Sequence, residues 1–145
     1  MSQPRRILMI DDEPEWIRPH AEALEEEGCA VTRMMDVDDA IRLLEKESFD
    51  LIVLDLLMPP PAAMGRNFDF DTDVDLRETG VWLHREIREH LGIQNVPIII
   101  MSVVRDKEIR DKINTVERNY GNRVYYRTKP ILPSDLINEV ERVLR

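Results

Sequence analysis

The chain has one cysteine, Cys29, among its 145 residues, so it cannot form an internal disulfide. This favours a protein of the reducing cytoplasm over a disulfide scaffold. No apolar stretch approaches the roughly 20 residues of a membrane-spanning helix, and the polar residues 1–6 do not begin a signal peptide. Basic residues are also scarce, because 20 Lys and Arg face 29 Asp and Glu, giving a formal charge of −9. That charge argues against direct binding to nucleic acid or to an anionic membrane.

The composition that is present is typical of a globular domain. Apolar residues make up 43% of the chain and charged residues 34%, and 145 residues suffice for one hydrophobic core. The sequence has no internal repeat and no low-complexity linker. We therefore expect a single domain over residues 1–145, with no effector domain in this sequence.

Strand and helix patterns alternate five times along the chain. Short apolar runs predict strands at 6–10, 30–34, 49–54, 97–101 and 124–128. Amphipathic patterns predict helices from Pro14 to Gly28, from a cap at Asp36 or Asp38 to before Phe49, from after Gly80 to near Gly92, from Asp106 or Lys107 to Gly121, and from a cap at Ser134 to Leu144. Right-handed crossovers turn such a (βα)5 chain into a doubly wound parallel sheet, an α/β fold with helices on both faces.

Four of these strands lead into a polar or charged residue at their carboxyl end. Asp11 and Asp12 follow the first strand, Asp55 the third, Ser102 the fourth and Lys129 the fifth. In open α/β sheets this edge is where ligands bind. Each residue taken alone could be a helix cap, a turn residue or a surface lysine. Their recurrence at one edge predicts a single site.

These residues, in this order, resemble the receiver domain of two-component response regulators. The resemblance covers nearly the whole chain and implies a flavodoxin-like five-stranded sheet with strand order 2-1-3-4-5. It implies that Asp55 accepts a phosphoryl group from the phosphohistidine of a histidine kinase or histidine phosphotransfer protein. It also implies Mg²⁺ as cofactor, bound by Asp11, Asp12, Asp55 and the backbone carbonyl of Leu57.

The resemblance extends to the catalytic partners and to a conformational switch. Lys129 and Ser102 would contact phosphoryl oxygens, and the Lys129–Pro130 peptide bond is expected to be cis. Ser102 and Tyr126 match the switch pair of the family, so phosphorylation would reshape the face of the fourth helix, fifth strand and fifth helix. A homodimer through this face is one option. The alternative for Tyr126 is an ordinary half-buried strand aromatic.

Three apolar residues beside the site depart from the family pattern. Leu57 and Val104 stand where family members influence hydrolysis, and neither side chain can orient an attacking water. Val103 replaces a small residue and is expected to narrow access to Asp55. These departures predict a long-lived phosphoryl-aspartate.

An acidic insertion at about 60–79 lengthens the connection between the third strand and the next helix. Residues 68–76 alternate apolar and acidic side chains, which favours a short edge strand or hairpin arm. The acids of residues 67–78 also have EF-hand spacing, but Thr72 stands where that loop needs glycine. We therefore favour a solvated flap beside the site over a second metal site.

The sequence thus predicts a phosphoacceptor that signals by protein contact or relays phosphate, not an enzyme with a separate substrate. Two alternatives remain at this stage. One is a receiver-fold interaction module that binds partners without turnover. The other is a phosphohydrolase, which normally needs a second acid close after its nucleophile, where this chain has Leu56 and Leu57.

Overall fold

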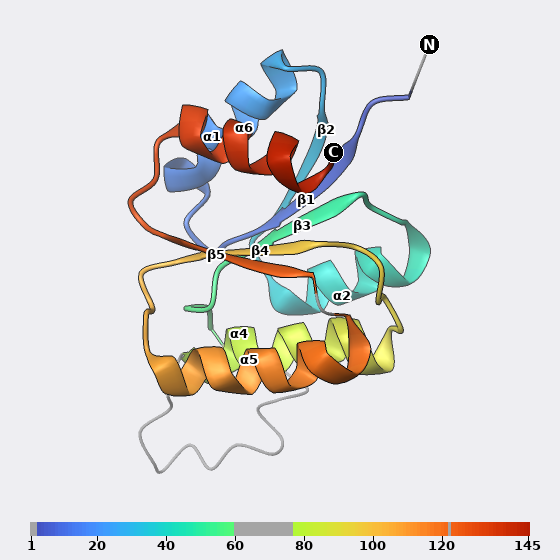
Figure 1. Ribbon diagram of the computed structural model, residues 1–145. Coiled ribbons are helices and arrows are strands. Elements are labelled where there is room, and N and C mark those ends of the chain that lie inside the picture. The colour runs from blue at the N-terminus through green and yellow to red at the C-terminus, as the bar shows by residue number, and fades with distance from the viewer. Residues whose placement is uncertain (1–2, 60–76, 122) are drawn as a thin grey trace.

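The computed structural model describes residues 3–59, 77–121 and 123–145, and Figure 1 shows their arrangement. The elements are β1 (Arg6–Ile10), α1 (Pro14–Glu26), β2 (Ala30–Met34), α2 (Val37–Lys46), β3 (Leu51–Leu54), α4 (Arg77–Arg85), the π-helical turn η1 (Glu86–His90), β4 (Ile98–Ser102), α5 (Lys107–Tyr120), β5 (Val124–Thr128) and α6 (Pro133–Val143). The edge strand and the EF-hand spacing considered for the insertion involve residues outside this description.

The five strands form one parallel sheet with the order β2-β1-β3-β4-β5, as predicted. Ile7 of β1 pairs with Val31 of β2 on one side and with Leu51 of β3 on the other. The chain therefore moves outward from β1 to β2 and then returns across β1 to begin β3. In open α/β sheets ligands bind where this direction reverses, and here that place is the carboxyl ends of β1 and β3.

Helices cover both faces of the sheet (Figure 1), with α1 and α6 on one face and α2, α4 and α5 on the other. Alternate residues of each buried strand point to opposite faces, so each layer has its own apolar core. On β1, for example, Leu8 and Ile10 belong to the cluster beneath α2, α4 and α5. Ile7 and Met9 belong to the cluster beneath α1 and α6. None of the helices in the described ranges is long and apolar enough to cross a membrane.

The structure decides between the two candidate caps of α2 and corrects the predicted cap of α6. Of the two candidate caps of α2, Asp36 takes the role, because its side chain accepts hydrogen bonds from the backbone N–H of Asp38 and Asp39. The predicted cap at Ser134 is wrong. Helix α6 begins one residue earlier, at Pro133, whose ring fixes the backbone in a conformation suited to the first helical turn.

The predicted boundary at Gly80 is also wrong, because this glycine lies inside α4. Its backbone N–H donates to the carbonyl of Leu56, 3.1 Å away. A Cβ atom placed on Gly80 would lie 2.3 Å from the Cα of Leu56. Glycine is therefore required by the close approach of α4 to the loop that follows β3, and not by the end of a helix.

A buried polar network joins α4, η1 and α5. Helix residue Glu117 receives contacts from His84 (Nε2 to Oε1, 2.6 Å), Arg88 (Nε to Oε1, 2.8 Å) and the backbone N–H of Arg123 (3.0 Å to Oε2). The fully buried Arg88 guanidinium also donates to the backbone carbonyls of Ile93, Val96 and Arg123. These carbonyls lie in the segments that lead into β4 and β5, so the network anchors the amino edge of the sheet.

Candidate functional site

Three residues of the predicted site are fixed to the carboxyl edge of the sheet by one additional backbone hydrogen bond each. The N–H of Asp11 donates to Met34 at the end of β2, and the N–H of Asp55 donates to Ile10 at the end of β1. The N–H of Lys129 donates to Ser102 at the end of β4. Each bond extends the sheet ladder by one residue, so the side chains leave from fixed positions at the carboxyl edge of the sheet.

The side chains of Asp11 and Asp55 share the Lys129 ammonium. Lys129 Nζ lies 2.8 Å from Asp11 Oδ2 and 3.1 Å from Asp55 Oδ2. The Oδ1 atom of each carboxylate accepts a backbone N–H two residues further along, from Glu13 at 2.9 Å and from Leu57 at 3.3 Å. All three charged side chains are more than nine-tenths buried. Each carboxylate is thus oriented by its own loop and presents its other oxygen to the lysine.

The electrostatics of this cluster are dominated by burial and by negative charge. Burial raises the pKa of the Asp11 carboxyl, and the negative charge of Asp55 adds to this effect, which outweighs the hydrogen bond from Lys129. The pKa of Asp12 is raised by burial and by the charges of Asp55 and Glu13. Burial works against the Lys129 charge, but the contacts with Asp11 and Asp55 prevail and raise its pKa. Lys129 is therefore firmly protonated.

The donor set fits a hard divalent cation. Asp11, Asp12 and Asp55 can each present one carboxylate oxygen within 4.8 Å of the others. One ammonium faces these three carboxylates, so negative charge remains in excess. Carboxylate oxygens are the protein ligands that Mg²⁺ uses, usually two or so alongside bound waters. The residues predicted as metal ligands by their side chains therefore lie close enough together to hold one ion.

Ser102 and Tyr126 occupy neighbouring strands but are not bonded to each other. Ser102 is buried at the end of β4, and its Oγ accepts the N–H of Val104 at 3.3 Å. The Tyr126 hydroxyl donates to Asn114 Oδ1 on α5 at 2.8 Å, and the Arg110 guanidinium lies 4.7 Å from its ring centre. Burial raises the pKa of Tyr126 to about 12. The phenol is thus held against α5.

The apolar residues predicted to surround the site differ in exposure. Leu57 and Val104 are half-buried, whereas Val103 leaves 54% of its surface exposed. The peptide bond between Lys129 and Pro130 is cis.

Two aromatic residues of α1, Trp16 and His20, lie beside the site. The Lys129 ammonium lies 4.4 Å from the ring centre of Trp16. His20 stacks on Trp16 and places Nε2 2.6 Å from the carbonyl oxygen of Ile131. A signal was present, because His20 occupies the same helical stripe as Ile17 and Leu24, where a polar ring needs a buried partner.

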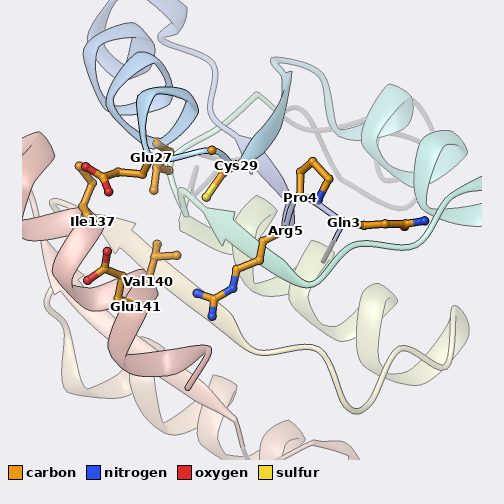
Figure 2. Close-up of a pocket in the computed structure, with 10 residues that line it drawn as sticks. Gln3, Pro4, Arg5, Glu27, Cys29, Ile137, Val140 and Glu141 are labelled. Atoms are coloured by element: carbon orange, nitrogen blue, oxygen red, sulfur yellow. The ribbon is translucent and has the colours of Figure 1, made fainter. Parts of the chain in front are cut away.

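A cavity of about 290 Å³ is lined by residues outside this site. Figure 2 shows the side chains that line it. It is lined by the segment before β1, the carboxyl end of α1 and helix α6. Arg5, Glu27 and Glu141 supply charge, and Cys29 supplies its half-buried thiol. Burial raises the pKa of that thiol, which disfavours the nucleophilic thiolate and agrees with a structural cysteine.

Comparison with known proteins supports the same interpretation. The sequence model of the response regulator receiver domain matches residues 7–65. A CheY-like response regulator receiver domain protein from Methanospirillum hungatei JF-1 superposes with a TM-score of 0.75 at 20% identity, covering 97% of this chain and 94% of that one. Chemotaxis response regulator CheY4 of Vibrio cholerae has a TM-score of 0.73 at 21% identity, with 97% and 99% covered.

A two-component response regulator from Clostridium difficile is similar in the same way. Its TM-score is 0.72 at 22% identity, and the alignment covers 97% of this chain and 96% of that chain. At such identities the superpositions establish the fold alone. The sequence model over residues 7–65 and the fold of the whole chain are both similar to those of response regulator receiver domains.

Proposed function

We propose that this chain acts as a response regulator receiver domain and that Asp55 is its phosphoryl acceptor. The observation that carries the proposal is the cluster of charged side chains at the carboxyl ends of β1, β3 and β5. There, the Asp55 carboxylate lies beside Asp11 and Asp12 and 3.1 Å from the Lys129 ammonium. No other group of three or more metal-ligating side chains occurs in the described part of the chain.

In the proposed reaction a carboxylate oxygen of Asp55 attacks the phosphorus of a phosphohistidine on a partner protein. The new O–P bond forms as the P–N bond breaks, and the imidazole leaves with the electron pair and takes up a proton. The product is an acyl phosphate. Lys129 is the group in this chain that offsets negative charge on the transferred phosphoryl group, and its pKa above the ordinary lysine value keeps it charged for that purpose.

Asp11, Asp12 and Asp55 would hold Mg²⁺, with the backbone carbonyl of Leu57 as a further ligand. The bound ion supplies neutralisation of charge between the attacking carboxylate and the phosphoryl oxygens. We expect Mg²⁺ to be required because the cluster is rich in negative charge. Two acids with raised pKa values, Asp11 and Asp12, stand next to the nucleophile.

The output proposed for the phosphorylated state is a change on the α5–β5–α6 face. Ser102 would turn its hydroxyl from the Val104 N–H toward the phosphoryl group, and Tyr126 would leave Asn114 to occupy the space behind it. The partners expected are a histidine kinase or a histidine phosphotransfer protein upstream, and a protein that recognises this face downstream. Self-association through the same face is a second outcome of that change.

Labelling by a small phosphodonor tests the proposal. The wild-type protein, incubated with acetyl phosphate or phosphoramidate, should gain one phosphoryl group when Mg²⁺ is present and none when it is chelated. Asp55→Asn should remain unlabelled under both conditions. Asp50→Asn is a matched control, because Asp50 precedes the same strand but lies at the opposite edge, where it accepts the N–H of Arg6.

Intact mass under non-acidic conditions and loss of the label in hydroxylamine would identify an acyl phosphate. A wild-type protein that takes up no label with Mg²⁺ would instead favour a receiver-fold interaction module. Turnover of a free phosphate ester by the wild type, lost in Asp55→Asn, would point to a phosphohydrolase.

A further inference from the structure

The structure points to a positioning role for Trp16 and His20, which we infer hold the Lys129 ammonium in place for phosphoryl transfer to Asp55. This inference rests on the proposed function. It concerns two aromatic side chains of α1 that neither the site motif nor the family match singles out.

The ammonium of Lys129 has three neighbours in the described chain. Two are the carboxylates of Asp11 and Asp55, and the third is the indole of Trp16, whose ring centre lies 4.4 Å from Nζ. This distance is within the roughly 6 Å over which a ring face attracts a cation, and Trp is the most effective ring for this contact. Because the lysine side chain is only 8% exposed, water screens the contact weakly.

In the proposed reaction, the two carboxylate contacts of Lys129 change and the contact with the indole does not. The carboxylate oxygens that Lys129 now contacts belong to a nucleophile and to an expected metal ligand, so both change partners when the phosphoryl group arrives. The indole takes no part in the chemistry. Its face is therefore the contact that can hold the ammonium beside Asp55 while the carboxylates exchange partners.

His20 fixes the plane of that indole. The two rings stack with centres 4.7 Å apart and an angle of 17° between planes. Since the carbonyl oxygen of Ile131 can only accept, His20 Nε2 must donate the hydrogen bond that spans 2.6 Å. Trp16 and His20 lie one helical turn apart on α1. Helix α1 therefore contacts the segment around the Lys129–Pro130 bond twice, at the Lys129 ammonium and at the Ile131 carbonyl.

A rate measurement tests the role in transfer. With acetyl phosphate and Mg²⁺, Trp16→Leu should be phosphorylated about threefold to thirtyfold more slowly than wild type, the range that a cation–π contact of this kind represents. Trp16→Phe retains a ring face and should recover part of the rate. Trp82→Leu is the matched control, because Trp82 is a second half-buried indole on α4, across the sheet, and its loss should leave the rate unchanged.

A measurement without metal or phosphodonor tests the contact itself. Ring current from the Trp16 face should move the ε-methylene protons of Lys129 upfield of those of Lys107, whose side chain is 89% exposed. Trp16→Leu should abolish that shift, and His20→Leu should reduce it by freeing the indole plane. If the indole face did not lie against the lysine, the Lys129 shift would be the same in the wild type and in both variants.

The outcomes separate this inference from the function on which it rests. A wild type that is labelled on Asp55 while Trp16→Leu and Trp16→Phe react at the wild-type rate would overturn the positioning role alone. So would Lys129 methylene protons that resonate with those of Lys107. A wild type that is never labelled would overturn the proposed function and the rate argument with it, whereas the shift measurement would still decide whether Trp16 holds the lysine.

Discussion

The buried network around Glu117 makes a pH-dependent contribution to stability. Burial opposes the charge of this carboxylate, but the hydrogen bonds from His84 and Arg88 prevail and lower its pKa from 4.5 to about 2. A depressed pKa in the folded state means that the stabilisation is complete above the unfolded value of 4.5 and is lost as pH falls toward 2. At about 1.4 kcal/mol per pKa unit, the full effect is about 3 kcal/mol, of which about 2 kcal/mol is lost by pH 3.

The perturbation that isolates this effect is Glu117→Gln. At pH 6 it leaves the fully buried guanidinium of Arg88 without its counter-charge, which is expected to cost about 3–5 kcal/mol. At pH 3 the ionised Glu117 carboxylate stabilises the wild-type fold less than at pH 6. The difference in free energy of unfolding between the two proteins should therefore shrink by about 2 kcal/mol.

Urea unfolding of both proteins at pH 6, 5, 4 and 3 measures the difference directly. Glu108→Gln is the control, because Glu108 lies on the same helix but is exposed, and its difference from wild type should change little over this range. A Glu117→Gln penalty that stays constant from pH 6 to pH 3 would show that the network does not depress this pKa.

Three further predictions concern the site and the switch. Gly80→Ala should destabilise the fold by about 1–3 kcal/mol and slow labelling of the acceptor aspartate, because the new methyl group would displace the Leu56 backbone; urea unfolding and phosphodonor labelling measure the two effects. Tyr126→Phe should remove one alkaline titration at 295 nm, and the wild type should lose stability between pH 10 and about 12, because a raised tyrosine pKa favours the folded state only below that window. The acyl phosphate should decay slowly after removal of donor, and hydrolysis should quicken when Leu57 or Val104 is replaced by a polar residue; decay as fast as in chemotaxis receivers would contradict this.

Much of the site was predictable because its signals are local. Asp11, Asp55 and Lys129 each follow an apolar run, and in a parallel sheet the ends of such runs meet at one edge. Helix α2 was predictable for the same reason. The pattern left two candidates for its N-cap, Asp36 and Asp38, and only the hydrogen bonds of Asp36 decided between them.

The residues that were missed act through partners far along the chain. Trp16 meets Lys129, and His84 meets Glu117, across separations that no local pattern encodes. What the sequence did contain was a polar residue on an apolar helical stripe, which indicates a buried partner without naming it. Gly80 was misassigned likewise, because its requirement comes from Leu56 on another segment and not from the helix it belongs to.

The sequence by itself determined the order of strands and helices, the carboxyl edge at which polar residues gather, and the chemical types present there. Apolar periodicity and strand-end residues are short-range properties, so they can be read along the chain. The tertiary structure alone decided which carboxylate oxygens contact Lys129 and which aromatic ring packs against its ammonium. It also decided which acid balances the buried charge of Arg88. Those choices depend on distances between segments that come together only when both faces of the sheet are packed.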